Sequence, residues 1–295
     1  MTRCEISGRR FRIPIVAIAL LATAACGQER VLVAQPLQPI EMAPRSVTRP
    51  AVAVVEATTV VRPRRVQLPP PVPRVSRQAL IVGIDHSVGI TPLEGAVTDA
   101  TNMQTLLQQS GFRNANIDML LDGAATRPAI LAGLRGLAAR ASASGITVVV
   151  VATHARRDNG VSSFRTAEGA RISPGELAAI LRTVPGRLWI VLAVCYAGGY
   201  AVPGVVGPNR VVTFASPADR PAYEVGRLGS YLVLYMVRRE LLDAHVATVE
   251  EAFSRARSAL EIEHPDRLPM MSDGVPGGLS LKGSAQTLER PAASR

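Results

Sequence analysis

The sequence predicts an α/β domain in which a mostly parallel central sheet of about six strands carries helices on both faces. Two observations lead to this prediction. Short, almost wholly apolar segments recur between residues 79 and 215, each with the length of a strand that is buried on both faces of a sheet. Segments with apolar residues at helical spacing alternate with them, as expected for parallel strands that are joined by helical crossovers.

The predicted strands and helices follow each other in a simple order. The strands are expected at residues 79–85, 117–121, 146–152, 188–194 and 211–215, and the helices at 93–110, 127–141, 173–183, 229–242 and 249–262. The helix at 173–183 has a distinct start signal, because Ser173, Pro174 and Glu176 stand at its cap, first and third positions. The polar residues 156–171 are expected to form a loop or hairpin, with a turn at Asp158-Asn159-Gly160.

Residues 1–26 have the pattern of an export signal. Four arginines precede an apolar run at 13–22 that is too short for a transmembrane helix, and small residues follow it. The ending Leu-Ala-Thr-Ala-Ala-Cys resembles a bacterial lipoprotein signal, with Cys26 as the residue that carries the lipid. We therefore expect an exported protein that is anchored to a membrane through Cys26. The alternative is a periplasmic or secreted protein that is cleaved near Ala25.

Residues 27–78 are rich in proline and arginine and are predicted to form a disordered tether. The folded domain is expected at 79–282, and a disordered tail at 283–295. Residues 1–78 hold 12 arginines against 4 acidic residues, which is +8 of the net charge of +10. The folded part is therefore close to neutral, which argues against nucleic acid as a partner.

The chain has three cysteines, Cys4, Cys26 and Cys195, and the first two belong to the leader. Cys195 therefore has no partner in the predicted domain, which excludes a disulfide framework and a cysteine-rich metal site there. A solitary cysteine in an exported protein suggests a catalytic thiol. The alternative is a small residue of the core.

His154 and Cys195 each follow the end of an apolar strand, and 41 residues separate them. This spacing leaves room for a crossover between two parallel strands, whose carboxyl ends meet at one edge of the sheet. An imidazole beside a thiol forms a cysteine–histidine dyad, in which the thiolate attacks a carbonyl carbon. Gly198 and Gly199 would let the backbone turn sharply after Cys195, so that N–H groups can point at an oxyanion. Asp85 and His86 end the first strand at the same edge and are candidate substrate-binding residues, although a solvated loop is the alternative for His86.

Several local patterns resemble the caspase-like domain of metacaspases. They are Ala-Leu-Ile-Val-Gly-Ile-Asp at 79–85, Leu-Glu-Gly-Ala-Val-Thr-Asp-Ala at 93–100, Gly111-Phe112, the histidine and cysteine strands in that order, and Ala222-Tyr223-Glu224. The resemblance covers residues 80–280 and implies a three-layer sandwich of caspase type.

The resemblance also implies site residues and a reaction. It makes His154 the general base, Cys195 the nucleophile, and the N–H groups of Ala155 and Cys195 the oxyanion hole. It makes Asp99 an acidic residue that lines the pocket for a basic side chain, with a local hydrogen bond as the alternative role. The implied reaction is hydrolysis of peptide bonds in protein or peptide substrates after arginine or lysine. No cofactor is expected, although many metacaspases use calcium.

The chain also departs from the metacaspase pattern. Ala155 replaces the usual glycine after the histidine, and Ala193 replaces a second acidic residue of the pocket, so that basic specificity would depend on Asp99 alone. The run Cys-Tyr-Ala-Gly-Gly-Tyr at 195–200 also looks like legumain-type relatives, which prefer asparagine or aspartate. A degenerate caspase fold that only binds partners is the non-enzymatic alternative. If arginine specificity holds, candidate self-cleavage sites are Arg62, Arg64, Arg65, Arg74 and Arg77.

Overall fold

The computed structural model describes residues 76–282. The predicted signal with Cys26, nearly all of the predicted tether and the predicted tail lie outside these residues. Within 76–282, no helix combines the length and the hydropathy that a membrane crossing requires.

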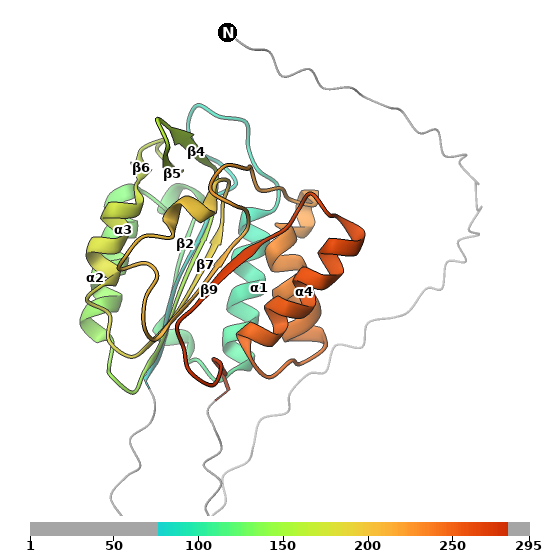
Figure 1. Ribbon diagram of the computed structural model, residues 1–295. Helices are drawn as coiled ribbons and strands as arrows, with labels where there is room; N and C mark the ends of the chain where they lie inside the picture. Colours follow the sequence, from blue (N-terminus) through green and yellow to red (C-terminus); the bar gives the residue numbers. More distant parts are fainter. Residues whose placement is uncertain (1–75, 283–295) are drawn as a thin grey trace, which may run out of the picture. The chain divides into compact units, whose positions relative to one another are not determined.

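A six-stranded sheet forms the centre of the domain (Figure 1). Its strands lie in the order β2 (Ile117–Leu121), β1 (Arg77–Gly83), β3 (Ile146–Ala152), β7 (Arg187–Ala193), β8 (Arg210–Phe214) and β9 (Met270–Asp273). All neighbours pair in parallel except β8 and β9, which are antiparallel. This mostly parallel six-stranded sheet confirms the predicted fold class. Every residue of β3 and nearly every residue of β7 is buried, as expected for strands that are covered on both faces.

Helices cover both faces of the sheet and complete a three-layer arrangement (Figure 1). One face carries α1 (Ala96–Gln109), the π-wound helix η5 (Val233–Asp243) and α4 (Val249–Glu263), and the other carries α2 (Arg127–Arg140) and α3 (Pro174–Leu181). The expected start of α3 is present as a capping box: the Ser173 hydroxyl accepts the N–H of Glu176, and the Glu176 carboxylate accepts the N–H of Ser173.

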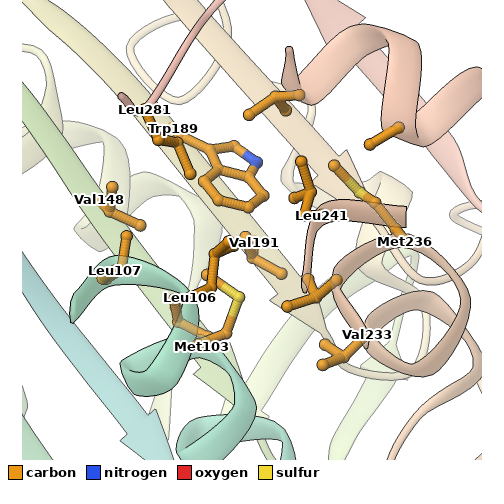
Figure 2. Close-up of a cluster of buried hydrophobic side chains, with 14 of the residues drawn as sticks. Met103, Leu106, Leu107, Val148, Trp189, Val191, Val233, Met236, Leu241 and Leu281 are labelled. Carbon is orange, nitrogen blue, oxygen red and sulfur yellow. The ribbon is translucent and has the colours of Figure 1, made fainter. Parts of the chain in front are cut away.

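Two hydrophobic cores lie on the two sides of the sheet. The core beneath α1 and η5 contains Trp189 of β7, which is fully buried among side chains of both helices (Figure 2). The other core joins the opposite face of the sheet to α2 and α3. Alternate residues of β7 therefore serve opposite cores, which fixes its register against β3 and β8.

A small second sheet, β4–β5–β6, lies at the carboxyl edge of the central sheet (Figure 1). Its strands β4 (Ala155–Asp158), β5 (Val161–Arg165) and β6 (Arg171–Ile172) are antiparallel. The predicted turn connects β4 and β5: Asn159 and Gly160 have φ values of 48° and 82°, the left-handed pair that a two-residue hairpin requires. The polar segment at 156–171 is therefore mostly paired strand.

Four short 3-10 helices connect these elements. They are η1 (Asn114–Asn116), η2 (Asp122–Ala124), η3 (Ala197–Tyr200) and η4 (Gly226–Leu228). Of these, η3 follows Cys195 directly, and η4 lies in the long connection between β8 and η5.

Two predictions about strands were wrong in detail. Strand β1 begins at Arg77, two residues before the predicted start, because Arg77 and Gln78 pair with Ile146 and Thr147. Strand β9 was not predicted, because it has only four residues, two of them exposed, and lies at the edge of the sheet. Its pairing with β8 is a tertiary contact that no local apolar run announces.

Candidate active site

Strands β3 and β7 bring His154 and Cys195 to one edge of the sheet. The two strands are neighbours, and Ala152, the last residue of β3, pairs with Ala193, the last residue of β7. His154 and Cys195 each stand two residues beyond this pair. Their equivalent positions follow from the parallel register alone, as the sequence predicted.

Both side chains line a cavity of about 260 Å³ above the sheet edge. The other lining residues are Leu93, Ala96, Asp99, Thr153, Ala193, Val194, Ala222, Tyr223, Glu224 and Ser230. Four connections therefore wall the cavity: the loop before α1 with the first turn of α1, the link between β3 and β4, the turn after β7, and the long loop after β8. Among residues 76–282, no group of three histidine, cysteine or acidic side chains is arranged to hold a metal ion.

The imidazole of His154 is oriented by a backbone carbonyl. Its Nε2 lies 2.8 Å from the carbonyl oxygen of Thr91. Because a carbonyl only accepts hydrogen bonds, Nε2 carries the proton, and Nδ1 of the neutral ring is left as an acceptor. Sequence reasoning missed Thr91, because the carbonyl that serves this role depends on the path of a loop and not on a residue type.

The thiol of Cys195 is half-buried, and its surroundings raise its pKa and so favour the protonated form. Burial raises its pKa, a backbone hydrogen bond from Ala222 partly opposes this, and the nearby carboxylate of Glu224 raises the pKa further. Sγ also lies 3.5 Å from the carbonyl oxygen of Ala222. Among the hydrogen bonds of residues 76–282, none joins the thiol to the imidazole. The two groups therefore share a cavity without a preformed ion pair, and such contacts commonly tighten only when substrate is bound.

The N–H groups of Ala155 and Cys195 are both free of the main ladders. The bond from Arg165 N–H to the His154 carbonyl, at 2.7 Å, makes Ala155 and Phe164 a non-hydrogen-bonded pair of the β4–β5 ladder. The N–H of Ala155 therefore points away from β5. The N–H of Cys195 makes no hydrogen bond within the described part of the chain.

The chain turns sharply after Cys195, as expected, but the glycines are not the residues that make the turn. The residue with the left-handed backbone is Tyr196, at φ 54°, and neither Gly198 nor Gly199 has a positive φ. These glycines are needed for close approach instead. A Cβ on Gly198 would lie 2.6 Å from the backbone nitrogen of Ala218, and one on Gly199 would lie 2.0 Å from the Ser162 hydroxyl.

Asp99 lines the cavity and also makes the local hydrogen bond that was its alternative role. Its carboxylate accepts the N–H of Ser230 at 3.0 Å and is only 1% exposed. Burial raises its pKa well above the ordinary value, more than this hydrogen bond lowers it, and the charges of Glu224 and Asp85 raise it further. Ionisation of Asp99 is therefore less favourable than that of an exposed carboxyl group.

Glu224 supplies a second acidic group, which the sequence analysis had not assigned. Its carboxylate accepts the N–H groups of Glu94 and Gly95, at 3.0 and 3.2 Å, at the start of α1. It lines the same cavity as Asp99. The sequence could have indicated Glu224, because it lies in the loop that follows the parallel strand β8, and such loops lie at the carboxyl edge of the sheet.

The structure does not bring Asp85 and His86 to the cavity. The Asp85 carboxylate accepts the N–H groups of Ala96 and Val97 and so caps α1. The His86 ring is exposed, with Nδ1 3.5 Å from the carboxylate of Asp122. Both residues are at the expected edge of the sheet, but the chain turns there, and their side chains face the start of α1 and the loop after β2.

A larger cavity of about 450 Å³ adjoins the first and shares Ala222 and Tyr223 as a wall. Three arginines line it, Arg220, Arg257 and Arg267, together with Asp219 and Asp266. Arg267 stacks on the ring of Tyr223, with its guanidinium carbon 3.3 Å from the ring centre.

Comparisons with known proteins agree with this geometry. Residues 76–180 match the sequence profile of the family described as caspase domain; the match includes His154 and ends before Cys195. Caspase-1 from Spodoptera frugiperda superposes with a TM-score of 0.56 at 12% sequence identity, over 72% of this chain and 92% of its own. The described part of the chain therefore has a caspase-like fold.

A second solved structure supports the same fold for the caspase-like domain. A protein from Geobacter sulfurreducens superposes with a TM-score of 0.56 at 13% identity, over 68% of this chain and 94% of its own. No curated protein sequence matches the chain. Proteins of the caspase domain family are in general cysteine peptidases.

Proposed function

We propose that this protein is a cysteine endopeptidase of metacaspase type, with Cys195 as the nucleophile and His154 as the general base. The observation that carries the proposal is the shared cavity: parallel neighbouring strands deliver the thiol and the imidazole to it. The Thr91 carbonyl supports the assignment, because it leaves His154 Nδ1 able to accept a proton.

The reaction begins with the neutral thiol. His154 Nδ1 takes the proton from Cys195 Sγ as the sulfur attacks the carbonyl carbon of the scissile peptide bond. The N–H groups of Ala155 and Cys195 stabilise the negative oxygen of the tetrahedral intermediate. His154 then gives its proton to the departing amine, and water, deprotonated by the same ring, hydrolyses the thioester. The raised pKa of Cys195 means that proton transfer accompanies attack.

We further propose that the cavity selects a basic side chain next to the scissile bond. Glu224 and Asp99 both line it, whereas no arginine or lysine does. A cation in the cavity would stabilise the ionised form of Asp99, whose pKa is raised when the cavity is empty. This charge pattern favours arginine or lysine over the asparagine or aspartate that legumain-type relatives prefer. The adjoining arginine-lined cavity would hold further residues of an extended peptide.

The test is hydrolysis of otherwise identical fluorogenic peptides that end in arginine, lysine, asparagine or aspartate, with and without calcium. We expect wild type to cleave the arginyl and lysyl peptides, and both Cys195→Ala and His154→Ala to lose this activity by more than about 10³-fold. Preference for the asparaginyl peptide would replace the specificity proposal with the legumain-type alternative.

The second candidate is a binding module without catalytic activity. The raised pKa of Cys195 and its contact with Ala222 in place of His154 favour this candidate. Wild type and Cys195→Ala with equal rates on all four peptides would support the binding module and overturn the peptidase proposal.

A further inference from the structure

Strand β5 is connected to the backbone of the candidate general base. The N–H of Arg165, at the end of β5, donates to the carbonyl of His154 at 2.7 Å. The hydroxyl of Thr153 donates to the carbonyl of Arg165 at 3.1 Å. The same strand also holds the loop that contains Thr91, because the Arg165 guanidinium donates to the Ser87 hydroxyl at 3.0 Å and to the Val88 carbonyl.

The opposite end of β5 is connected to the turn that follows the candidate nucleophile. The hydroxyl of Ser162, which is 1% exposed, donates to the carbonyl of Tyr196 at 2.9 Å. Tyr196 has the left-handed backbone noted above, a conformation that is unfavourable for a non-glycine residue and persists only where the surroundings enforce it. Gly199 permits this contact, since any side chain there would collide with the Ser162 hydroxyl.

Tyr200 makes a second connection from the same turn. Its buried hydroxyl accepts the N–H of Phe164 and donates to the carbonyl of Ile172, both at 2.7 Å. It thus bridges β5 and β6, and its ring stacks on Phe164 with centroids 5.8 Å apart. Ser162 and Tyr200 do not line the cavity that contains His154 and Cys195. Both act on the site only through the backbone.

We propose that Ser162 and Tyr200 are positioning residues that hold the Cys195 turn at a fixed place relative to His154 and Ala155. The proposal rests on the dyad of the proposed function. Its physical reason is that thiol and imidazole come from separate strands and have no direct hydrogen bond, so their separation depends on what joins the two turns. A displacement of about 1 Å between reacting groups can lower a rate by about 100-fold.

The first test compares Ser162→Ala and Tyr200→Phe with matched controls in the full chain. Ser163→Ala removes a hydroxyl from the opposite face of β5, and Tyr235→Phe removes a hydroxyl that bonds Glu263 and does not line the cavity of His154 and Cys195. We expect both test variants to lower kcat by about 10- to 100-fold with KM changed by less than about threefold, and both controls to keep wild-type kcat. Thermal unfolding would confirm that all four variants are folded at the assay temperature.

The second test does not require peptidase activity. The rate at which iodoacetamide alkylates Cys195, with loss of iodide and formation of a thioether, is followed against pH by mass spectrometry of the tryptic peptide at 188–210. We expect His154→Ala to lose reactivity at low pH, because the imidazole no longer takes the thiol proton. Ser162→Ala and Tyr200→Phe should follow His154→Ala, and the two controls should follow wild type.

The outcomes separate this proposal from the peptidase proposal. If wild type hydrolyses no peptide but the alkylation profiles divide as expected, the peptidase function fails and the positioning role stands. If both test variants share the wild-type alkylation profile, or if wild type and His154→Ala coincide, the positioning role is overturned. The positioning role is also overturned if the decrease in kcat of each test variant equals the decrease in its folded fraction.

Discussion

Asp99 is the residue whose burial most directly predicts a pH effect on stability. Its carboxyl pKa is raised in the folded protein, so between the ordinary value near 3.8 and the folded value the unfolded state releases a proton that the folded state keeps. Stability from this group is therefore present below about pH 4 and falls as pH rises, by at most about 1.4 kcal/mol per pH unit.

Asp99→Asn should consequently become more stable than wild type by an amount that grows from pH 4 towards neutrality. An asparagine still offers an oxygen to the N–H of Ser230 but never ionises. Urea unfolding at several pH values measures the difference, with the exposed Asp243→Asn as the control. A difference between Asp99→Asn and wild type that does not change with pH would contradict this account.

Glu224→Gln should change two properties of the site in opposite directions. Removal of the negative charge lowers the pKa of Cys195, so the alkylation profile should move to lower pH. The same change removes an anion that faces the substrate, so kcat/KM for arginyl peptides should fall by about 10-fold, as for a partly exposed ion pair. Glutamine has a single acceptor oxygen and can replace only one of the two hydrogen bonds to the N–H groups of Glu94 and Gly95, while Asp85 still caps α1. An unchanged arginyl kcat/KM would assign basic specificity to Asp99 alone.

At the scale of elements, helix α3 connects the small sheet to β7, and its start is fixed locally. Ser173→Ala removes one half of the capping box and should lower the free energy of unfolding by about 1 kcal/mol. Ser258→Ala, at an exposed position within α4, is the control and should be neutral or slightly stabilising. Equal urea midpoints for the two variants would show that α3 does not depend on its cap.

The small sheet is the element whose importance to the site became visible only after folding. Sequence analysis predicted its turn at Asn159–Gly160 but not its contacts, because the partners of β5 lie on three other segments of the chain. Such contacts leave no periodic pattern in the sequence. A serine such as Ser162 looks in the sequence like any other serine of a polar hairpin.

At the scale of the whole molecule, we propose that arginines of the predicted tether are self-cleavage sites. With basic specificity, intact-mass analysis of the full chain should show new amino termini after Arg62, Arg64, Arg65 or Arg74 in wild type and none in Cys195→Ala. Arg77 is no longer expected, because it begins β1 and Gln78 after it is buried. Identical termini in the two proteins would remove the self-cleavage proposal.

Lipid attachment to Cys26 is a separate proposal, which includes export of the chain. Cys26→Ala should move the protein from the membrane fraction to the soluble fraction after export, because a lipid on that residue would be its anchor. Fractionation with the Cys4→Ala variant as control measures this. An unchanged distribution would favour the plain secretory signal.

The sequence by itself determined the layers of this domain and the edge at which chemistry is placed. Apolar runs such as 146–152 and 188–194 specify strands that are buried on both faces, and parallel pairing then fixes where His154 and Cys195 emerge. Both steps depend on local patterns and on general rules of chain connection.

Only the tertiary structure decided how the site is built around these two side chains. Thr91 contributes a carbonyl, Glu224 contributes a charge from 70 residues beyond His154, and Tyr196 takes the strained turn that had been assigned to the glycines. The side chains of Asp85 and His86 point away from the cavity because each has a partner elsewhere, at the start of α1 and at Asp122 respectively. The direction of a loop side chain depends on the nearest unsatisfied backbone group, and for Asp85 that group was the amino terminus of α1.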